Sequence, residues 1–142
     1  MGKINWGRVI LGGIVAGIVM NVIDYVVNVP LLGARWMSET TLLHLTNAPS
    51  AGASALGWIL SDLVLGLLTV WIYAGFRPRY NPGPLTALRA GFAVWAISGI
   101  AYSCLCFMGL YSHALVFHSA VGGLVAKLLG AWVGAMLYSE AA

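Results

Sequence analysis

Residues 9–29 read VILGGIVAGIVMNVIDYVVNV, an apolar run in which Asp24 is the one charged residue. A helix needs about 20 apolar residues to cross the hydrocarbon core of a bilayer, and in lipid the segment must be helical because no water satisfies exposed backbone groups. Three further runs of this kind follow, at residues 53–76, 90–110 and 114–137. The sequence therefore predicts an all-α integral membrane protein, with residues 1–142 forming one domain, a bundle of four transmembrane helices.

The composition of the chain also indicates a lipid environment. Of its 142 residues, 61% are hydrophobic and 8% are charged, whereas soluble domains carry roughly 25% charged residues. The net charge of +3 is not gathered into a basic stripe, so no nucleic-acid partner is expected. The sequence shows neither a nucleophile paired with a base nor a phosphate-binding glycine loop, and we therefore expect no enzymatic activity.

The basic residues predict the orientation in the membrane. Arg35 lies on one side of the expected spans. The other basic residues outside the spans lie on the opposite side: Lys3, Arg8, Arg77, Arg79 and Arg89. Because Lys and Arg accumulate in cytoplasmic loops, both termini are expected in the cytoplasm. The outer connection at residues 31–52 is longer than a turn requires, and Ser38 is expected to begin a short helix in it that ends at Leu45.

Proline and glycine mark the other connections. Pro30 is expected to end the first span. Residues 77–89 are expected to form a loop, because several residues in this stretch oppose a helix: Pro78, Pro82, Gly83 and Pro84. A short turn around Gly109 is expected to join the last two spans as an antiparallel hairpin.

Each expected span carries one face of small or polar residues. Helices in lipid associate through small residues and interhelical hydrogen bonds, and steps of three or four residues place side chains on one helix face. The glycines that recur at such steps are expected at helix contacts: Gly13, Gly17, Gly66, Gly123, Gly130 and Gly134.

Asp24, Asp62 and Lys127 are ionisable residues inside the expected spans. An isolated charge at the centre of a transmembrane helix disfavours insertion by about 2.5–3.5 kcal/mol, so the lysine is expected to pair with one or both carboxylates. Asn21 and Asn28 share the polar face of the first span and are expected to belong to this charge cluster. Two interpretations stay open: the cluster fixes which helices face one another, or it passes protons or ions.

Sulfur and imidazole side chains lie near the last hairpin and are weak candidates for a metal site: Cys104, Cys106, Met108 and His113. The two cysteines diverge on a helix, so we expect neither a bound metal ion nor a disulfide there. His118 lies one turn inside the fourth span and, as a single histidine, can serve as the axial ligand of a haem or a chlorophyll-type pigment.

The stretch between the second and third spans is the most distinctive string of the sequence. Its basic and aromatic residues are expected to contact anionic lipid headgroups or a partner subunit: Arg77, Arg79, Tyr80 and Arg89. Residues 77–84 (RPRYNPGP), together with residues 11–17 (LGGIVAG), resemble a loose group of small four-span bacterial membrane proteins of unknown function. The resemblance implies a location in the bacterial cytoplasmic (inner) membrane and implies no activity.

Three functions remain open for a non-enzymatic membrane protein of this kind. The first is an accessory or scaffolding subunit that packs against a larger membrane complex, with other membrane subunits or further copies of the chain as partners. The second is a small proton- or ion-coupled transporter that uses Asp24, Asp62 and Lys127. The third is a haem- or pigment-binding membrane subunit that uses His118.

Overall fold

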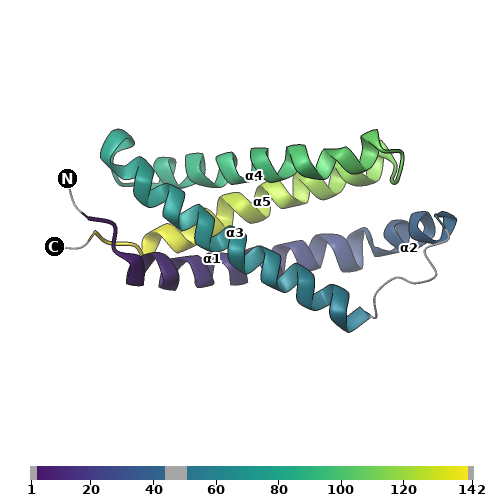
Figure 1. Ribbon diagram of the computed structural model, residues 1–142, viewed down its shortest axis with the longest axis horizontal. Coiled ribbons are helices and arrows are strands. Elements are labelled where there is room, and N and C mark those ends of the chain that lie inside the picture. Colours follow the sequence, from purple (N-terminus) through teal and green to yellow (C-terminus); the bar gives the residue numbers. More distant parts are fainter. Residues whose placement is uncertain (1–2, 44–50, 141–142) are drawn as a thin grey trace.

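The computed structural model describes residues 3–43 and 51–140, the side chains of residues 51–53 excepted. All the secondary structure elements in this described part are helices (Figure 1): α1 (Trp6–Val26), a π-helical turn η1 (Val27–Leu31), α2 (Gly33–Leu42), α3 (Ala51–Tyr80), α4 (Pro84–Phe107) and α5 (His113–Met136). Within it, four helical segments are long and apolar enough to cross a membrane: Trp6–Leu31, Ser54–Tyr80, Pro84–Phe107 and His113–Met136. The predicted all-α architecture is confirmed, and so is the presence of four helices long and apolar enough to span a membrane.

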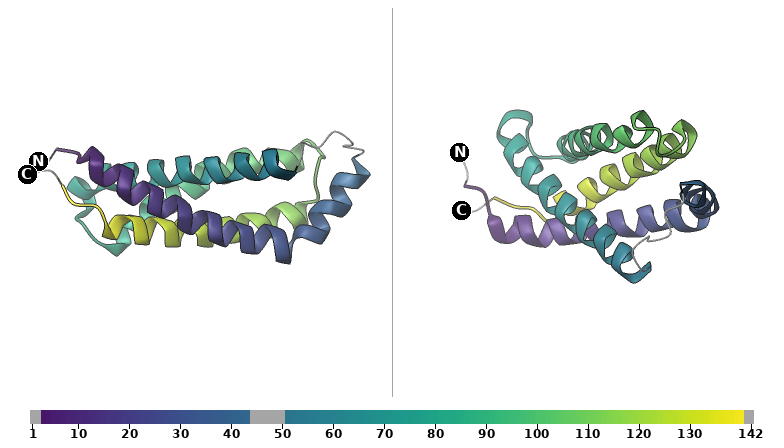
Figure 2. Two further views of the ribbon diagram at one scale, coloured as in Figure 1. Left: turned by 90° about the horizontal axis from the view of Figure 1, so that it is seen from below. Right: turned by 45° about the vertical axis from the view of Figure 1, so that its right-hand side comes forward.

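The bundle has two distinct ends (Figures 1 and 2). The start of α1, the end of α5 and the α3–α4 turn lie at one end, which we call the termini end. α2 and the α4–α5 turn lie at the opposite end, which we call the α2 end. α1 packs against both α3 and α5, and α4 packs against α5 and less extensively against α3. Sequence periodicity does not reveal this order of helices.

Glycines allow the helix backbones to touch where they cross. A Cβ atom on Gly12 would lie 2.6 Å from the carbonyl oxygen of Gly134, and one on Gly134 would lie 2.7 Å from the carbonyl oxygen of Gly12. At the α1–α3 crossing, a Cβ atom on Gly17 would lie 2.7 Å from the Cα atom of Leu63, and one on Gly66 would overlap the backbone of α1. Small residues thus close the bundle, as is usual in lipid.

The predicted packing glycines are found at such crossings with one exception. Gly13, Gly17, Gly66, Gly130 and Gly134 all face backbone or side-chain atoms of a neighbouring helix that a Cβ atom would overlap. A Cβ atom on Gly123 would instead meet nothing within 4 Å, so the prediction for this residue is wrong. Gly122 takes its place, 2.5 Å from Val27 Cγ1 by the same measure. One residue turns a helix by about 100°, so a register error of one residue selects the wrong face.

The first span ends at Leu31, one residue after the proline that was predicted to end it, and Pro30 lies within the last helical turn. α1 passes directly into η1, where the N–H of Leu32 donates to the carbonyl of Val27 at 3.0 Å. A π turn holds more residues than an α turn, which accommodates a proline that lacks an N–H and crowds the preceding turn. Asn28 in the same turn donates its side-chain amide to the backbone carbonyl of Asp24 at 3.0 Å.

The loop predicted for residues 77–89 is much shorter in the structure. α3 continues past Pro78, which falls in its last turn, and α4 begins at Pro84. Proline suits the first helical position because the N–H there has no partner within the helix. Asn81 follows α3 in a left-handed conformation (φ 65°), and the hydroxyl of Thr86 donates to its carbonyl at 2.7 Å.

α2 occupies the first part of the connection predicted at residues 31–52. It begins at Gly33, directly after the π turn, so Ser38 lies inside the helix and donates its hydroxyl to the carbonyl of Arg35 at 2.9 Å. The prediction that Ser38 caps this helix is therefore wrong, and Leu45 lies outside the described residues.

Glu39 of α2 holds the first turn of α5. Ser112 caps α5 by accepting the N–H of Leu115 at 3.2 Å, and its hydroxyl and N–H donate to the Glu39 carboxylate at 2.6 and 2.7 Å. The hydrogen bond from the Ser112 hydroxyl lowers the pKa of Glu39 most, and the bond from the Ser112 N–H lowers it further. Desolvation acts in the opposite direction, and the positive charge of Arg35 also lowers this pKa. This contribution to stability is present above the ordinary carboxyl pKa of 4.5 and is lost as the pH falls through the lowered value.

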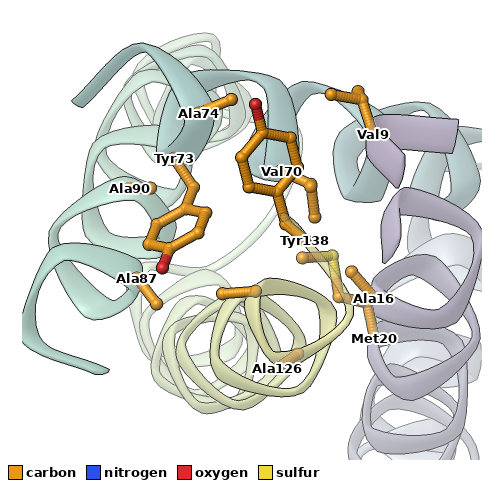
Figure 3. Close-up of a cluster of buried hydrophobic side chains, with 11 residues drawn as sticks. Val9, Ala16, Met20, Val70, Tyr73, Ala74, Ala87, Ala90, Ala126 and Tyr138 are labelled. Carbon is orange, nitrogen blue, oxygen red and sulfur yellow. The ribbon is translucent and has the colours of Figure 1, made fainter. Parts of the chain in front are cut away.

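The buried core lies toward the termini end (Figure 3). Tyr73 and Tyr138 meet edge to face there, with ring centroids 6.0 Å apart. Mostly small apolar side chains of four helices surround them: Val9, Ala16, Met20, Val70, Ala74, Ala87, Ala90, Ala126 and Ala135. Such side chains let the helix axes approach closely.

α3 and α4 diverge toward the α2 end. Residues 55–61 of α3 are all exposed, and burial in this helix begins at Asp62. In α4 the last buried residue is Val94, although the helix continues to Phe107. Figures 1 and 2 show the first part of α3 leaving α4 and α5. We call the diverging stretches, residues 55–61 and 95–107, the open half.

Candidate functional site

An intramembrane ion cluster joins three helices. The Nζ atom of Lys127 on α5 lies 2.6 Å from Asp24 Oδ2 on α1 and 3.5 Å from Asp62 Oδ1 on α3. Asp62 and Lys127 are 6% and 7% exposed, and the Asp24 side chain is 20% exposed. The structure therefore brings together the three ionisable residues that the sequence places inside the membrane.

The directions of the helices explain how Lys127 reaches Asp24. Counted along the helices from the α2 end, Asp24 lies seven residues before Leu31, about 10 Å, and Lys127 lies fourteen residues after His113, about 21 Å. Side chains lean toward the N-terminus of their helix. α1 starts at the termini end and α5 at the α2 end. The Asp24 side chain therefore leans toward the termini end and the Lys127 side chain toward the α2 end, so the two lean toward each other.

The two carboxylates contact the lysine ammonium at unequal distances. Asp24 makes a short charge-assisted hydrogen bond, of the kind that is roughly twice as strong as a neutral one, whereas Asp62 lies 0.9 Å farther from the same nitrogen. Within the described residues no other cation pairs with either carboxylate. With all three groups ionised, the cluster carries one uncompensated negative charge.

Asn21 does not belong to the cluster as predicted. Its side-chain amide donates to the carbonyl of Gly17 in its own helix at 3.0 Å and to the carbonyl of Ile59 on α3 at 3.2 Å. Asn21 therefore holds α1 against α3 at Ile59, within the open half, and its side-chain amide donates to backbone carbonyls and not to the cluster.

Asn28 organises a second polar group toward the α2 end. Its Oδ1 atom accepts hydrogen bonds from Ser119 Oγ at 2.8 Å and from Trp36 Nε1 at 3.1 Å, and the hydroxyl of Tyr102 donates to Ser119 Oγ at 3.3 Å. Asn28 also links this polar group to Asp24, because its side-chain amide donates to the backbone carbonyl of Asp24. Ser119 was not identified from the sequence as a polar residue of the bundle interior. Ser119 stands two helical turns before Lys127, and this spacing places both side chains on one face of the helix.

The weak candidates for a metal site lie apart on the surface of the last hairpin. Cys104 is exposed and Cys106 half-buried, both as free thiols, while Met108 and His113 are exposed. In residues 3–43 and 51–140, no three His, Cys, Asp or Glu side chains are grouped as a metal site requires. His118 lies on the exposed surface of α5, with Nδ1 2.6 Å from the carbonyl oxygen of Ala114.

Arg77, predicted to contact lipid headgroups or a partner subunit, turns inward in the structure. Its side chain is 15% exposed and its Nη1 atom lies 3.7 Å from Glu140 Oε1. Its guanidinium carbon lies 5.2 Å from the ring centroid of Tyr138 and 5.9 Å from that of Tyr73. Arg77 thus ties the end of α3 to the chain after α5, because a desolvated guanidinium is stabilised by aromatic faces and a carboxylate.

The other predicted contacts for lipid or a partner remain on the surface. Arg79, Tyr80 and Arg89 are exposed, and the guanidinium carbon of Arg89 lies 4.8 Å from the ring centroid of Tyr80. This contact crosses from the last residue of α3 to the second turn of α4.

The open half carries a groove of about 350 Å³ on α3. Ser54, Gly57, Trp58 and Ser61 line it. A Cβ atom on Gly57 would meet nothing within 4 Å, and glycine in a helix interior is about 1 kcal/mol less favourable than alanine. Packing within the chain therefore does not require glycine at this position, and the absence of a side chain there permits the close approach of a further helix.

The geometry limits the chemistry of the site. Two carboxylates and one ammonium can bind a proton or a cation, or can pair with a charged group on a neighbouring helix. The open half, which begins beside Asp62, can receive such a neighbour. No protein-family model, curated protein or solved structure matches this chain, so the arrangement of its own residues carries the functional argument.

Proposed function

We propose that the protein is a non-enzymatic accessory subunit of a bacterial inner-membrane complex, and that its open half binds a transmembrane helix of another subunit. The divergence of α3 and α4 carries this proposal, because it leaves residues 55–61 and 95–107 without a buried side chain. Helices of a closed bundle pack around a common core. Here the partner helix packs on the faces that the divergence leaves exposed, while Ile59 keeps its contact with α1 and Tyr102 its contact with α5.

The surface of the open half suits a helix contact. Transmembrane helices associate through small residues because lipid offers no hydrophobic drive. α3 presents Gly57 and Ser61 in its groove, and α4 presents the exposed small side chains of Ala101 and Cys104. Asp62 follows this surface on α3, but it is 6% exposed and its side chain faces Lys127, so the contact with the partner rests on the small side chains.

The basic residues support an orientation with both termini in the cytoplasm. Arg35 belongs to α2, while the other basic residues outside the cluster belong to the termini end: Lys3, Arg8, Arg77, Arg79 and Arg89. The positive-inside rule then directs the termini end to the cytoplasm. In this orientation the open half lies in the outer leaflet.

Gly57→Leu is expected to abolish co-migration with the complex. The new side chain points into open space within the chain, so the fold stays intact while a partner helix loses its close approach. The measurement is extraction from native membranes in mild detergent, followed by a native gel and mass spectrometry of the band. Gly75→Leu is the matched control, because Gly75 lies on the same helix, toward the termini end, and also has no atom within 4 Å of a Cβ.

Three outcomes would overturn the proposal. Wild-type protein that migrates alone has no stable partner. Wild-type protein that migrates only as a homo-oligomer is not an accessory subunit. Equal co-migration of the Gly57→Leu and Gly75→Leu variants would place the partner on another face.

A second function, proton- or ion-coupled transport, is favoured by the unequal charges of the cluster. Two carboxylates share one ammonium, and Asp62 holds the weaker share. A proton or small cation that binds Asp62 balances the charge, and its release restores the imbalance. Intramembrane carboxylates of this kind mark proton and ion pathways in transporters.

Asp62→Asn is the variant that separates transport from structure. It removes the spare charge and leaves the 2.6 Å pair of Lys127 with Asp24 intact. We expect it to abolish proton flux in liposomes loaded with a pH-sensitive dye and driven by a potassium diffusion potential. Glu140→Gln makes the same acid-to-amide change outside the spans and is expected to leave flux unchanged. Wild-type liposomes no leakier than empty ones, or a fully active Asp62→Asn variant, would rule transport out.

A further inference from the structure

A lipid-facing groove of about 560 Å³ lies at the termini end of the bundle. α3 contributes Phe76 and Tyr80, α4 contributes Leu85, Arg89 and Phe92, and α5 contributes Leu128. Its walls are apolar apart from one guanidinium and one phenol. The groove therefore suits a ligand that is apolar over most of its length and charged at one point.

The position of the groove matches the two regions of a lipid leaflet. Along α4 it extends from Leu85 to Ala93, eight residues or about 12 Å at the rise of an α-helix. It begins beside Tyr80, the last residue of α3, at the level where aromatic residues meet the membrane surface. Its inner part therefore lies at the depth of acyl chains and its mouth at the depth of headgroups.

Arg89 is the charged group at this mouth. Its guanidinium lies over the ring of Tyr80, which draws the long side chain back to the interface and holds it there. Arg77, one turn before the end of α3, lies 3.7 Å from the Glu140 carboxylate, whereas Arg89 forms no ion pair within the described residues. A planar guanidinium with free donors is the group that proteins use most for phosphate.

We propose that this groove is a binding site for an anionic phospholipid, with one acyl chain between α3 and α4 and the phosphate on Arg89. The site is separate from the open half, which lies at the other end of the same two helices. Anionic lipid is preferred because the unpaired guanidinium gains more from a headgroup with net negative charge than from a zwitterionic one.

The test is native mass spectrometry of protein purified from vesicles of equal parts phosphatidylglycerol and phosphatidylcholine. We expect wild-type protein to retain phosphatidylglycerol at least threefold over phosphatidylcholine, and Arg89→Gln to lose this preference. Arg35→Gln, an exposed arginine at the α2 end, is the control and is expected to retain it. Ala93→Trp fills the groove without changing charge and is expected to reduce retention of both lipids.

Two results would overturn the site. Equal retention of the two lipids by wild-type protein would show that the groove has no headgroup preference. An Arg89→Gln variant that keeps the preference would place the anionic lipid elsewhere. Neither result depends on whether a partner subunit binds the open half.

Discussion

Replacing Lys127 with methionine is expected to destabilise the bundle by about 3–5 kcal/mol, the usual loss when one partner of a buried ion pair is removed. Methionine keeps the length of the side chain, so packing changes little. The variant leaves Asp24 and Asp62 facing each other without the ammonium that lies 2.6 and 3.5 Å from them. The measurement is unfolding in mixed micelles with increasing dodecyl sulfate, followed by tryptophan fluorescence.

A neutral cluster is expected to recover most of this loss. The triple variant Asp24→Asn, Asp62→Asn, Lys127→Met removes all three charges, and neutral replacements of a buried ion cluster are often close to the original in stability. Lys3→Met, which removes an exposed charge at the start of the chain, is expected to unfold like wild type. If Lys127→Met unfolds at the same detergent concentration as Lys3→Met, the ion cluster does not hold the helices together.

Replacing Gly66 with valine is expected to cost about 3 kcal/mol, at the upper end of the range for overpacked interiors. A Cβ atom on Gly66 overlaps the carbonyl oxygen of Gly13 and the backbone of Gly17. Backbone atoms cannot move aside as the end of a flexible side chain does, so α1 and α3 must separate along their whole contact. The same detergent titration measures the loss.

Gly75→Val is the matched control for this prediction. It makes the same change on the same helix, at a position where a Cβ atom meets nothing within 4 Å. Its stability is expected to equal or slightly exceed that of wild type, because valine is a better helix former than glycine. Equal stabilities of the two variants would mean that the α1–α3 crossing is looser than the structure indicates.

The ion cluster also relates fold to function. It lies where buried positions of α3 begin, at the boundary between the closed part of the bundle and the open half. Lys127 is shared by α1 and α3, so any proton or cation that binds Asp62 competes with the ammonium that joins these helices. In the proposed transport function, a proton or cation on Asp62 would therefore weaken the 3.5 Å contact that joins α3 to the cluster.

Prolines show where local sequence rules were insufficient. Pro30 was expected to end the first span and Pro78 and Pro84 to lie in a loop, yet each belongs to a helical segment. Pro84 takes the first position of α4, Pro78 falls in a last turn, and Pro30 is accommodated by a π turn. In a membrane an unpaired backbone group is more unfavourable than in water, so the chain adjusts the helix around a proline before it gives the helix up.

The amino-acid sequence by itself determined the solvent, the four spans and the three charges that must meet. These follow from transfer free energies of side chains and backbone groups, which depend on each residue and its near neighbours. The order of the helices, the choice of Gly122 over Gly123 and the inward turn of Arg77 were decided by tertiary structure, because they depend on which surfaces meet. The open half was also decided by tertiary structure. α3 and α4 are similarly apolar along their lengths, and packing alone distinguishes their closed and open parts.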